Sequence, residues 1–208
     1  MSSAPCGPCT IFWDRATATR FGSRCASWVS RSPTERSTFC TGESRQRWFL
    51  EKNPVGQVPL LELEDGTCLC ESTAILFHIA EGSALLPDVP LLRTRILQWM
   101  CFEQTHVDGV ISRARFRRLY PAAVPTRPEE FEAWWAQGTR ALEILNAQLR
   151  HHEYLVGDSF SIADIANYAY VHRAAEGGFD MAPFGALREW FGRIEARPAY
   201  LPIDEVPG

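Results

Sequence analysis

Apolar residues recur every three or four positions along most of the second half of the chain, which is the spacing of one helical face. The first such stretch covers residues 91–120, and the second covers residues 129–150. A third follows Ser161, and a fourth, LREWFGRIEARPAY, is ended by Pro198. This pattern predicts an all-helical region over residues 88–204.

The third of these helices begins with a capping box. Ser161 is followed three positions later by Asp164, so each can accept a hydrogen bond from the other's main-chain N–H. An acid in this position closes the first turn of a helix. We therefore expect Asp164 to be structural and not a catalytic acid.

A shorter α/β pattern precedes the helices. A β-rich run covers residues 58–63, Glu64-Asp65-Gly66 forms a turn, and a second run covers residues 67–70. Glu71-Ser72 is then expected to cap the start of a helix. Pro59 lacks an N–H for the sheet, which predicts either an edge position or a cis bond.

Composition narrows the classes of function. The 208 residues carry a formal charge of −4, which argues against nucleic acid and against a polybasic membrane surface. No apolar run reaches the ~20 residues of a membrane helix, and no secretory signal opens the chain. The seven cysteines, an odd number, favour free thiols in a reducing compartment. No metal-ligand spacing is present.

The opening residues, 1–41, differ from the rest. No Leu occurs before Leu50 and no Lys before Lys52, and the apolar residues follow neither a strand nor a helix period. The segment contains Cys6-Gly7-Pro8-Cys9, the active-site tetrapeptide of thioredoxins. Only five residues precede Cys6, too few for the buried strand that this motif follows, so a thiol-disulfide oxidoreductase using Cys6 and Cys9 is an unfavoured alternative.

The run NPVGQVPLLELEDG, followed by CLCESTAILFHIAE, resembles the cytosolic glutathione transferases of bacteria, and the resemblance covers residues 42–200. It implies a thioredoxin-like α/β N-terminal domain, of which residues 42–82 are the remainder, and the all-α C-terminal domain of that family over residues 88–204. As written, the first domain is incomplete, because the resemblance leaves only a two-stranded hairpin and one helix.

The resemblance also implies a glutathione site. The main chain at Val58, before Pro59, pairs with the cysteinyl part of glutathione as an added strand. Glu71 and Ser72 hold the γ-glutamyl end, at a helix N-terminus that favours anions. Lys52 is a tentative further contact, and like Gln57 it is more simply explained as a solvated residue.

In function, the resemblance implies a transferase in which the thiolate of glutathione attacks a small electrophile, with glutathione as co-substrate and no metal. It further implies a cytoplasmic homodimer that binds neither nucleic acid nor membrane. Two alternatives stay open. One is a non-enzymatic binding or assembly module of the same fold, and the other is the Cys6/Cys9 oxidoreductase.

The group that activates the thiol is left unassigned, because the family carries it in the opening segment. The first helix of the helical domain lines the electrophile pocket of the family, which makes candidates of His106, Arg113, Arg117 and Tyr120. For each of them a solvated basic face, or a core position for His106, is the simpler interpretation.

Three explanations compete for residues 1–41: an organelle presequence, a divergent βαβ unit, or a reading-frame error. Shifted by one frame, Phe12-Trp13 must encode Leu and Trp13-Asp14 must encode Gly. Permitted codons from Cys9 onward spell Y-D-L-L-G-[S/P]-G-N-C-Y-K-V-R-L-A-L, similar to the opening of bacterial glutathione transferases. The frame error is therefore the leading hypothesis, and the segment is predicted not to be native-like.

Overall fold

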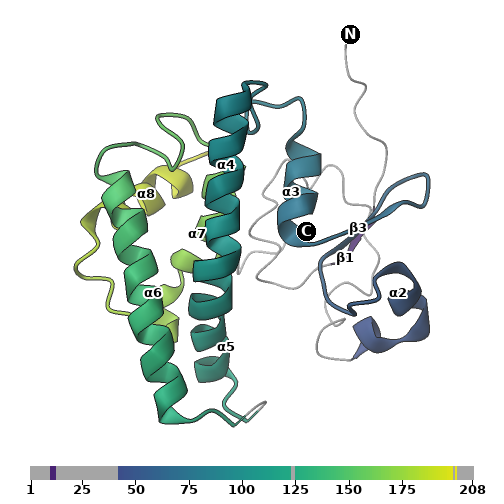
Figure 1. The fold of residues 1–208 in the computed structure, drawn as a ribbon, viewed down its shortest axis with the longest axis horizontal. Coiled ribbons are helices and arrows are strands. Elements are labelled where there is room, and N and C mark those ends of the chain that lie inside the picture. The colour runs from purple at the N-terminus through teal and green to yellow at the C-terminus, as the bar shows by residue number, and fades with distance from the viewer. Residues whose placement is uncertain (1–9, 13–41, 123–124, 199, 201–208) are drawn as a thin grey trace. The chain divides into compact units, whose positions relative to one another are not determined.

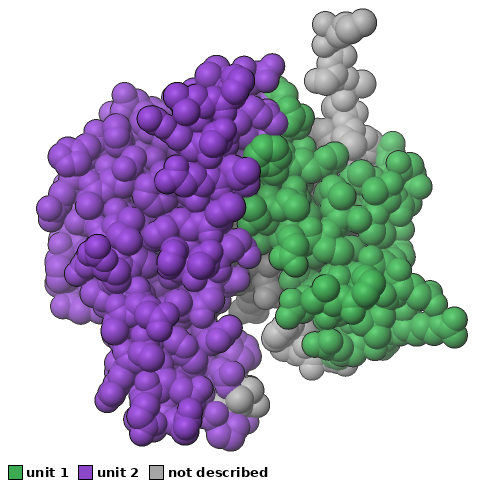
Figure 2. Space-filling view, in the orientation of Figure 1, with its two compact units in different colours: residues 1–82, 198–208 green, residues 83–197 purple. Residues whose placement is uncertain are grey.

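The computed structural model describes residues 10–12, 42–122, 125–198 and 200. The chain divides into two compact units, one formed by residues 1–82 with 198–208 and the other by residues 83–197 (Figure 2).

The first unit combines a small sheet with short helices. Its elements are β1 (Thr10–Phe12), η1 (Glu43–Arg45), α2 (Arg47–Lys52), β2 (Leu60–Glu62), β3 (Cys68–Cys70) and α3 (Ser72–Ala80). The strand order is β1-β2-β3, and both neighbouring pairs are antiparallel. Asp65 stabilises the β2–β3 turn by accepting a hydrogen bond from the Thr67 N–H at 2.8 Å.

The strand β1 corrects one expectation. The sequence pattern left only a two-stranded hairpin, but Thr10–Phe12 pairs along β2, with Ile11 opposite Leu61. Three residues are too few to show a period, which is why no strand was predicted in this segment. The Cys6/Cys9 pair, the frame-shifted reading of residues 13–41 and any βαβ unit there lie outside the described residues.

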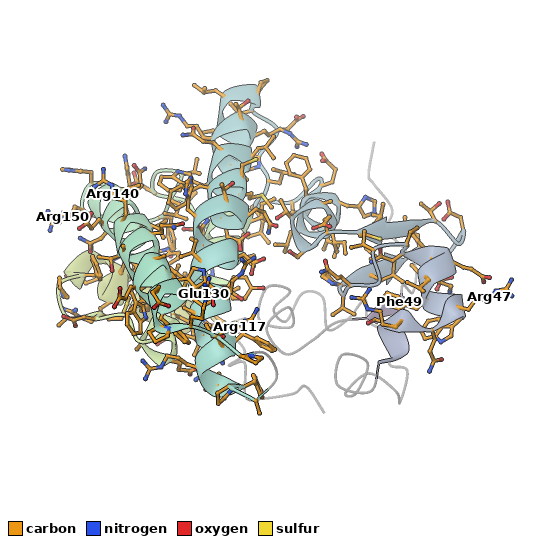
Figure 3. The ribbon with its side chains drawn as sticks, turned by 60° about the horizontal axis from the view of Figure 1, so that its bottom comes forward. Arg47, Phe49, Arg117, Glu130, Arg140 and Arg150 are labelled. Carbon is orange, nitrogen blue, oxygen red and sulfur yellow. The ribbon has the colours of Figure 1, made fainter. Side chains whose placement is uncertain are left out.

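One side of α2 is buried and the other faces solvent. Phe49 is fully buried, whereas Arg47, two positions earlier, is exposed and forms an ion pair with Glu51 (Figure 3). The buried side of α3 supplies Ile75 and Leu76, in agreement with the predicted helical spacing. With the fully buried Leu60, these apolar side chains hold the helices and the hairpin together.

The second unit is all-helical, as predicted. It contains α4 (Pro90–Phe102), the π-helical segment η2 (Glu103–Ser112), α5 (Arg113–Leu119), α6 (Pro128–Leu149), α7 (Ile162–Val171), η3 (Ala174–Gly177) and α8 (Gly185–Glu195). Figure 1 shows α4 continuing into α5 as one long rod beside α6. Its buried positions recur at helical spacing: Ile96, Met100, Val107, Ile111 and Ala114.

The capping box at the start of α7 is confirmed. Asp164 is fully buried and accepts hydrogen bonds from the Ser161 N–H at 3.0 Å and the Ser161 hydroxyl at 3.1 Å. Its other oxygen accepts from the Leu155 N–H at 2.9 Å and the Trp190 indole N–H at 3.0 Å. Burial raises the pKa of Asp164, against these four bonds that favour the carboxylate. The role of Asp164 is structural.

Across the described part of the chain, no helix has the length and apolarity needed to cross a membrane. Within the same residues, no group of three or more His, Cys, Asp or Glu side chains is arranged to hold a metal ion.

Candidate functional site

The end of the hairpin where β2 begins and β3 ends brings four predicted site residues together. Leu60, the first residue of β2, pairs with Cys70, the last residue of β3. Val58 and Pro59 directly precede Leu60, and Glu71 and Ser72 directly follow Cys70, so all four lie within two residues of this strand pair. Segments far apart in the predicted motif therefore meet at one edge, which we call the open end of the hairpin.

Val58 presents an unused main chain at this edge. The bond between Val58 and Pro59 is cis, one of the two possibilities that the sequence predicted. Val58 is half-buried, and its N–H and C=O make no hydrogen bond with any described residue. A free donor and a free acceptor on one extended residue can pair with an extended peptide-like ligand.

A buried asparagine shapes the loop that leads to Val58. The Asn53 side chain is 3 % exposed; it donates to the Gln57 carbonyl at 2.6 Å and accepts from the Val55 N–H at 3.1 Å. The sequence did not predict these hydrogen bonds of Asn53. An Asn directly before Pro in a turn is the signal that could have identified this role, because Asn side chains replace main-chain partners in turns.

Glu71 has the most unusual backbone of the described residues. It is the N-cap of α3 with φ of 70° and ψ of 117°, the only non-glycine residue there with positive φ. Such a conformation costs about 1–3 kcal/mol and is concentrated at functional sites. The structure corrects one expectation, since the Glu71 side chain does not cap the helix.

The Glu71 carboxylate is also unpartnered. It is exposed and makes no hydrogen bond or ion pair with a described residue. It stands at a helix N-terminus, beside the half-buried Ser72. An accepting carboxylate, a hydroxyl and the positive end of a helix dipole together suit a ligand group carrying both an ammonium and a carboxylate.

The two cysteines of β3 are poor nucleophiles. Burial raises the pKa of the Cys70 thiol, and the neighbouring Cys68 and Glu71 raise it further. Burial raises the pKa of Cys68 as well, with Glu62 adding to the effect. Because the thiolate is the reactive form, neither Cys68 nor Cys70 is an activated thiol.

Comparison with known proteins decides the family. The model of the glutathione S-transferase N-terminal domain matches residues 34–81, and that of the C-terminal domain matches residues 110–198. The chain belongs to the glutathione S-transferase family. A crystal structure of glutathione S-transferase from Pseudomonas fluorescens shares 38% identity with a TM-score of 0.85, covering 95% of this chain and 99% of that one.

Two relatives of this chain are named for functions other than glutathione transfer. Disulfide-bond oxidoreductase YfcG of Escherichia coli (strain K12) is 30% identical over 158 residues, which is 73% of each protein. Elongation factor 1-gamma-B of Xenopus laevis is 26% identical over 175 residues, 83% of this chain but only 39% of that protein.

Family membership confirms the predicted architecture, a thioredoxin-like domain followed by the all-helical domain. It leaves the individual contacts as predictions. The Lys52 amine forms an ion pair with Glu62, and Glu62 is the last residue of β2, away from the open end. Lys52 is also half-buried. The sequence had favoured a solvated residue at this position.

The four candidate residues on the helical unit lie in different surroundings. His106 is exposed, so the expectation of a core histidine is wrong; its ring packs on Phe102 at 4.9 Å. Arg113 and Tyr120 are exposed. Arg117 lies by Glu130 of α6, as the labels in Figure 3 show, and its charge helps to lower the pKa of Glu130.

Proposed function

We propose that this chain binds glutathione at the open end of the hairpin and joins it, through a new bond from its thiolate sulfur, to a small electrophile. The Val58 main chain, before Pro59, pairs with the cysteinyl part. Glu71 accepts from the ammonium group of the γ-glutamyl end, and Ser72 donates to its carboxylate. Lys52 is not part of this proposal, because its amine pairs with Glu62 at the other end of β2.

The observation that carries this proposal is the unpartnered, strained Glu71 carboxylate at the start of α3. A protein that used this residue only to begin a helix would gain stability from Gly or from a capping side chain here. Holding a charged group in a costly backbone conformation is explained by a ligand that needs it there.

The chemistry that follows is nucleophile activation and positioning. A free thiol has a pKa near 8.5, and a donor aimed at the sulfur favours the thiolate. The raised thiol pKa values of Cys68 and Cys70 argue against either as a redox group in this step. The activating group is left unassigned; family resemblance puts it in the opening segment.

The decisive experiment is calorimetric titration of glutathione into the full chain and three variants. Glu71→Gln removes the charge and is expected to weaken binding roughly 10- to 100-fold, since a charge-assisted hydrogen bond contributes about 1.5–3 kcal/mol. Ser72→Ala is expected to weaken it less. Glu64→Gln, an exposed acid in the hairpin turn, is the control. Equal affinities for Glu71→Gln and the control would overturn the site.

A second candidate reaction is supported by the similarity to the bacterial disulfide-bond oxidoreductase. Two glutathione molecules would reduce one disulfide to two thiols and leave oxidised glutathione. Turnover of a small disulfide, coupled to glutathione reductase and NADPH, compared with turnover of an aromatic halide, separates the two reactions. The Cys6→Ser, Cys9→Ser double variant distinguishes this reaction from one that uses the chain's own thiols.

A non-enzymatic module remains the candidate from another class, and the similarity to an elongation factor subunit supports it. Tight glutathione binding with no turnover of either substrate class would favour it. As for most of the family, we propose a cytoplasmic homodimer; sedimentation of the purified chain tests the dimer.

A further inference from the structure

Two cysteines of the first unit lie on one face of the same strand. Cys68 and Cys70 are the first and last residues of β3, so their side chains point to the same side of the sheet (β3 in Figure 1). The side chain of Leu69, between them, points to the opposite side. Both cysteines are half-buried free thiols. The pair is therefore within reach of a small ligand and is not used in a disulfide.

A charged pair lies next to the thiols on the same side of the sheet. Glu62 of β2 is directly opposite Cys68 in the strand pairing, and residues opposite one another share a face. The Lys52 amine of α2 forms an ion pair with the Glu62 carboxylate. Both charges reach the Cys68 thiol: burial raises its pKa most, Glu62 raises it further, and Lys52 lowers it. Lys52 is the only lysine of the 208 residues.

The spacing of the two thiols suits a bridging ion better than a disulfide. Positions two apart on a strand are separated by about 6.8 Å, and so are their Cβ atoms. A disulfide needs Cβ atoms about 3.5–4.5 Å apart. Turned toward each other in staggered rotamers, the two sulfur atoms approach to roughly 3.5 Å. Sulfur atoms on either side of an ion are about 4–4.6 Å apart, for bonds near 2.3 Å. An ion can therefore bridge Cys68 and Cys70 without distorting β3.

The Cys68 thiol needs only a change of rotamer to take part. It donates to the Gly66 carbonyl at 3.6 Å, and along the chain Gly66 lies on the other side of Cys68 from Cys70. A thiol is a weak donor, so little is lost when this contact is broken. Burial raises the pKa of Cys70, and the charge of Cys68 raises it further. The two sulfur atoms are therefore already within electrostatic reach of each other.

The donor set selects the kind of ion. Zinc takes four ligands, and among the described residues no group of three or more His, Cys, Asp or Glu side chains is arranged to hold a metal. Two thiolates suffice for a soft monovalent ion, and thiolate sulfur favours copper(I). Copper(I) on two thiolates has one net negative charge, which the Lys52 ammonium can balance.

We propose that Cys68 and Cys70 bind one copper(I) ion between their sulfur atoms, with Lys52 supplying the counter-charge. Each thiol loses its proton as its sulfur bonds to the ion, so two protons are released and no electron is transferred. The proposal does not rest on the proposed transferase function. Glu71→Gln separates the two, since it should lose glutathione and keep copper(I).

The test is competition for copper(I) between the full chain and the coloured chelator bathocuproine disulfonate, with ascorbate as reductant. The Cys6→Ser, Cys9→Ser double variant serves as the parent, because that pair of thiols would also compete. Cys68→Ser and Cys70→Ser are each expected to weaken binding about 100-fold or more, since even groups behind the ligands of a metal contribute about 10- to 100-fold. Cys101→Ser, at an exposed thiol of α4, is the matched control and should leave the affinity unchanged.

The counter-charge is tested on α2. Lys52→Gln is expected to weaken copper(I) about 3- to 10-fold, whereas Lys52→Arg keeps the charge and should stay within about twofold. Arg47→Gln removes an exposed charge from the same helix and is the control. Circular dichroism reports whether each variant folds, and Cys68→Ala and Cys70→Ala replace any serine variant that does not.

Several results would overturn the proposal. They are copper(I) binding that survives replacement of both Cys68 and Cys70, equal losses in Cys68→Ser and Cys101→Ser, or equal binding of zinc(II) at the same thiols. Oxidation of the parent by glutathione disulfide, followed by digestion and mass spectrometry, tests the spacing itself. A disulfide between Cys68 and Cys70 would contradict the geometry on which the bridging ion depends.

Discussion

The first turns of α3 and α7 each pair an acidic residue with a serine, but the two acidic side chains lie in opposite surroundings. Asp164 is buried and accepts four hydrogen bonds from three residues. Glu71 is exposed, accepts none from a described residue, and has a backbone φ of 70°. The first acid completes the fold, whereas the second makes no such contribution among the described residues. Contacts and backbone conformation distinguish the two, although each acid lies near a serine at a helix start.

The largest effect on stability is expected at Asp164, whose carboxylate accepts four hydrogen bonds. Asp164→Ala leaves the donors of Ser161, Leu155 and Trp190 buried without an acceptor, and we expect a loss of about 3–5 kcal/mol in the free energy of unfolding. The urea midpoint measures it. Asp158→Ala, at an exposed loop position, should change stability by less than about 0.5 kcal/mol. Matching losses in the two variants would mean that the buried network contributes nothing particular.

The loop that leads to the open end of the hairpin depends on the hydrogen-bonded side chain of Asn53. Asn53→Ala removes the hydrogen bonds to the Gln57 carbonyl and the Val55 N–H, and should cost about 1–3 kcal/mol. The same change should weaken glutathione binding, since the loop leads to Val58. Asn53→Asp keeps the acceptor for Val55 but loses the donor to Gln57, so its loss should be intermediate. An Asn53→Ala variant with native stability contradicts this role.

The contrast between the two helix starts was only half visible in the sequence. The capping box, the hairpin turn and the helical spacing are local patterns, so the Ser161–Asp164 box of α7 and the α/β-then-helical order could be predicted, whereas the bonds from Leu155 and Trp190 to Asp164 could not. The positive φ of Glu71 leaves no such pattern, because glutamate is not a residue type that marks this backbone conformation. The exposure of His106 was missed for a related reason: spacing places a residue on a flank but does not say what covers that flank.

At the C-terminal end of α7, the half-buried His172 is expected to make the fold less stable at low pH. His172 stacks on Tyr168 with ring centres 4.3 Å apart, and its Nδ1 meets the Tyr168 carbonyl at 2.5 Å. Burial lowers the pKa of His172; Arg173 and Arg115 lower it further, whereas the hydrogen bond and Glu195 oppose this.

The sign follows from proton uptake. Below the unfolded value near 6.5, the unfolded chain binds a proton that the folded chain does not, so stability is lost as the pH falls below about 6.5. His172→Phe keeps a ring for stacking and should flatten this slope by up to about 1.4 kcal/mol per pH unit, measured as urea midpoints from pH 7.5 to 5. His151→Gln, at an exposed histidine, is the control. A variant that keeps the full slope contradicts the assignment.

Substitutions of Glu71 are expected to change stability least. The sign of the change distinguishes a residue held for a ligand from a structural one. Glu71→Gly relieves the positive φ, and a glycine there should leave the free energy of unfolding unchanged or raise it by up to about 1 kcal/mol. Glu71→Gln keeps the strain and should match the parent. Both variants should lose glutathione affinity. If Glu71→Gly instead destabilised the chain as Asp164→Ala is expected to, Glu71 would be a second structural acid. A more stable chain that no longer binds glutathione would show that the strain at Glu71 is maintained for the ligand.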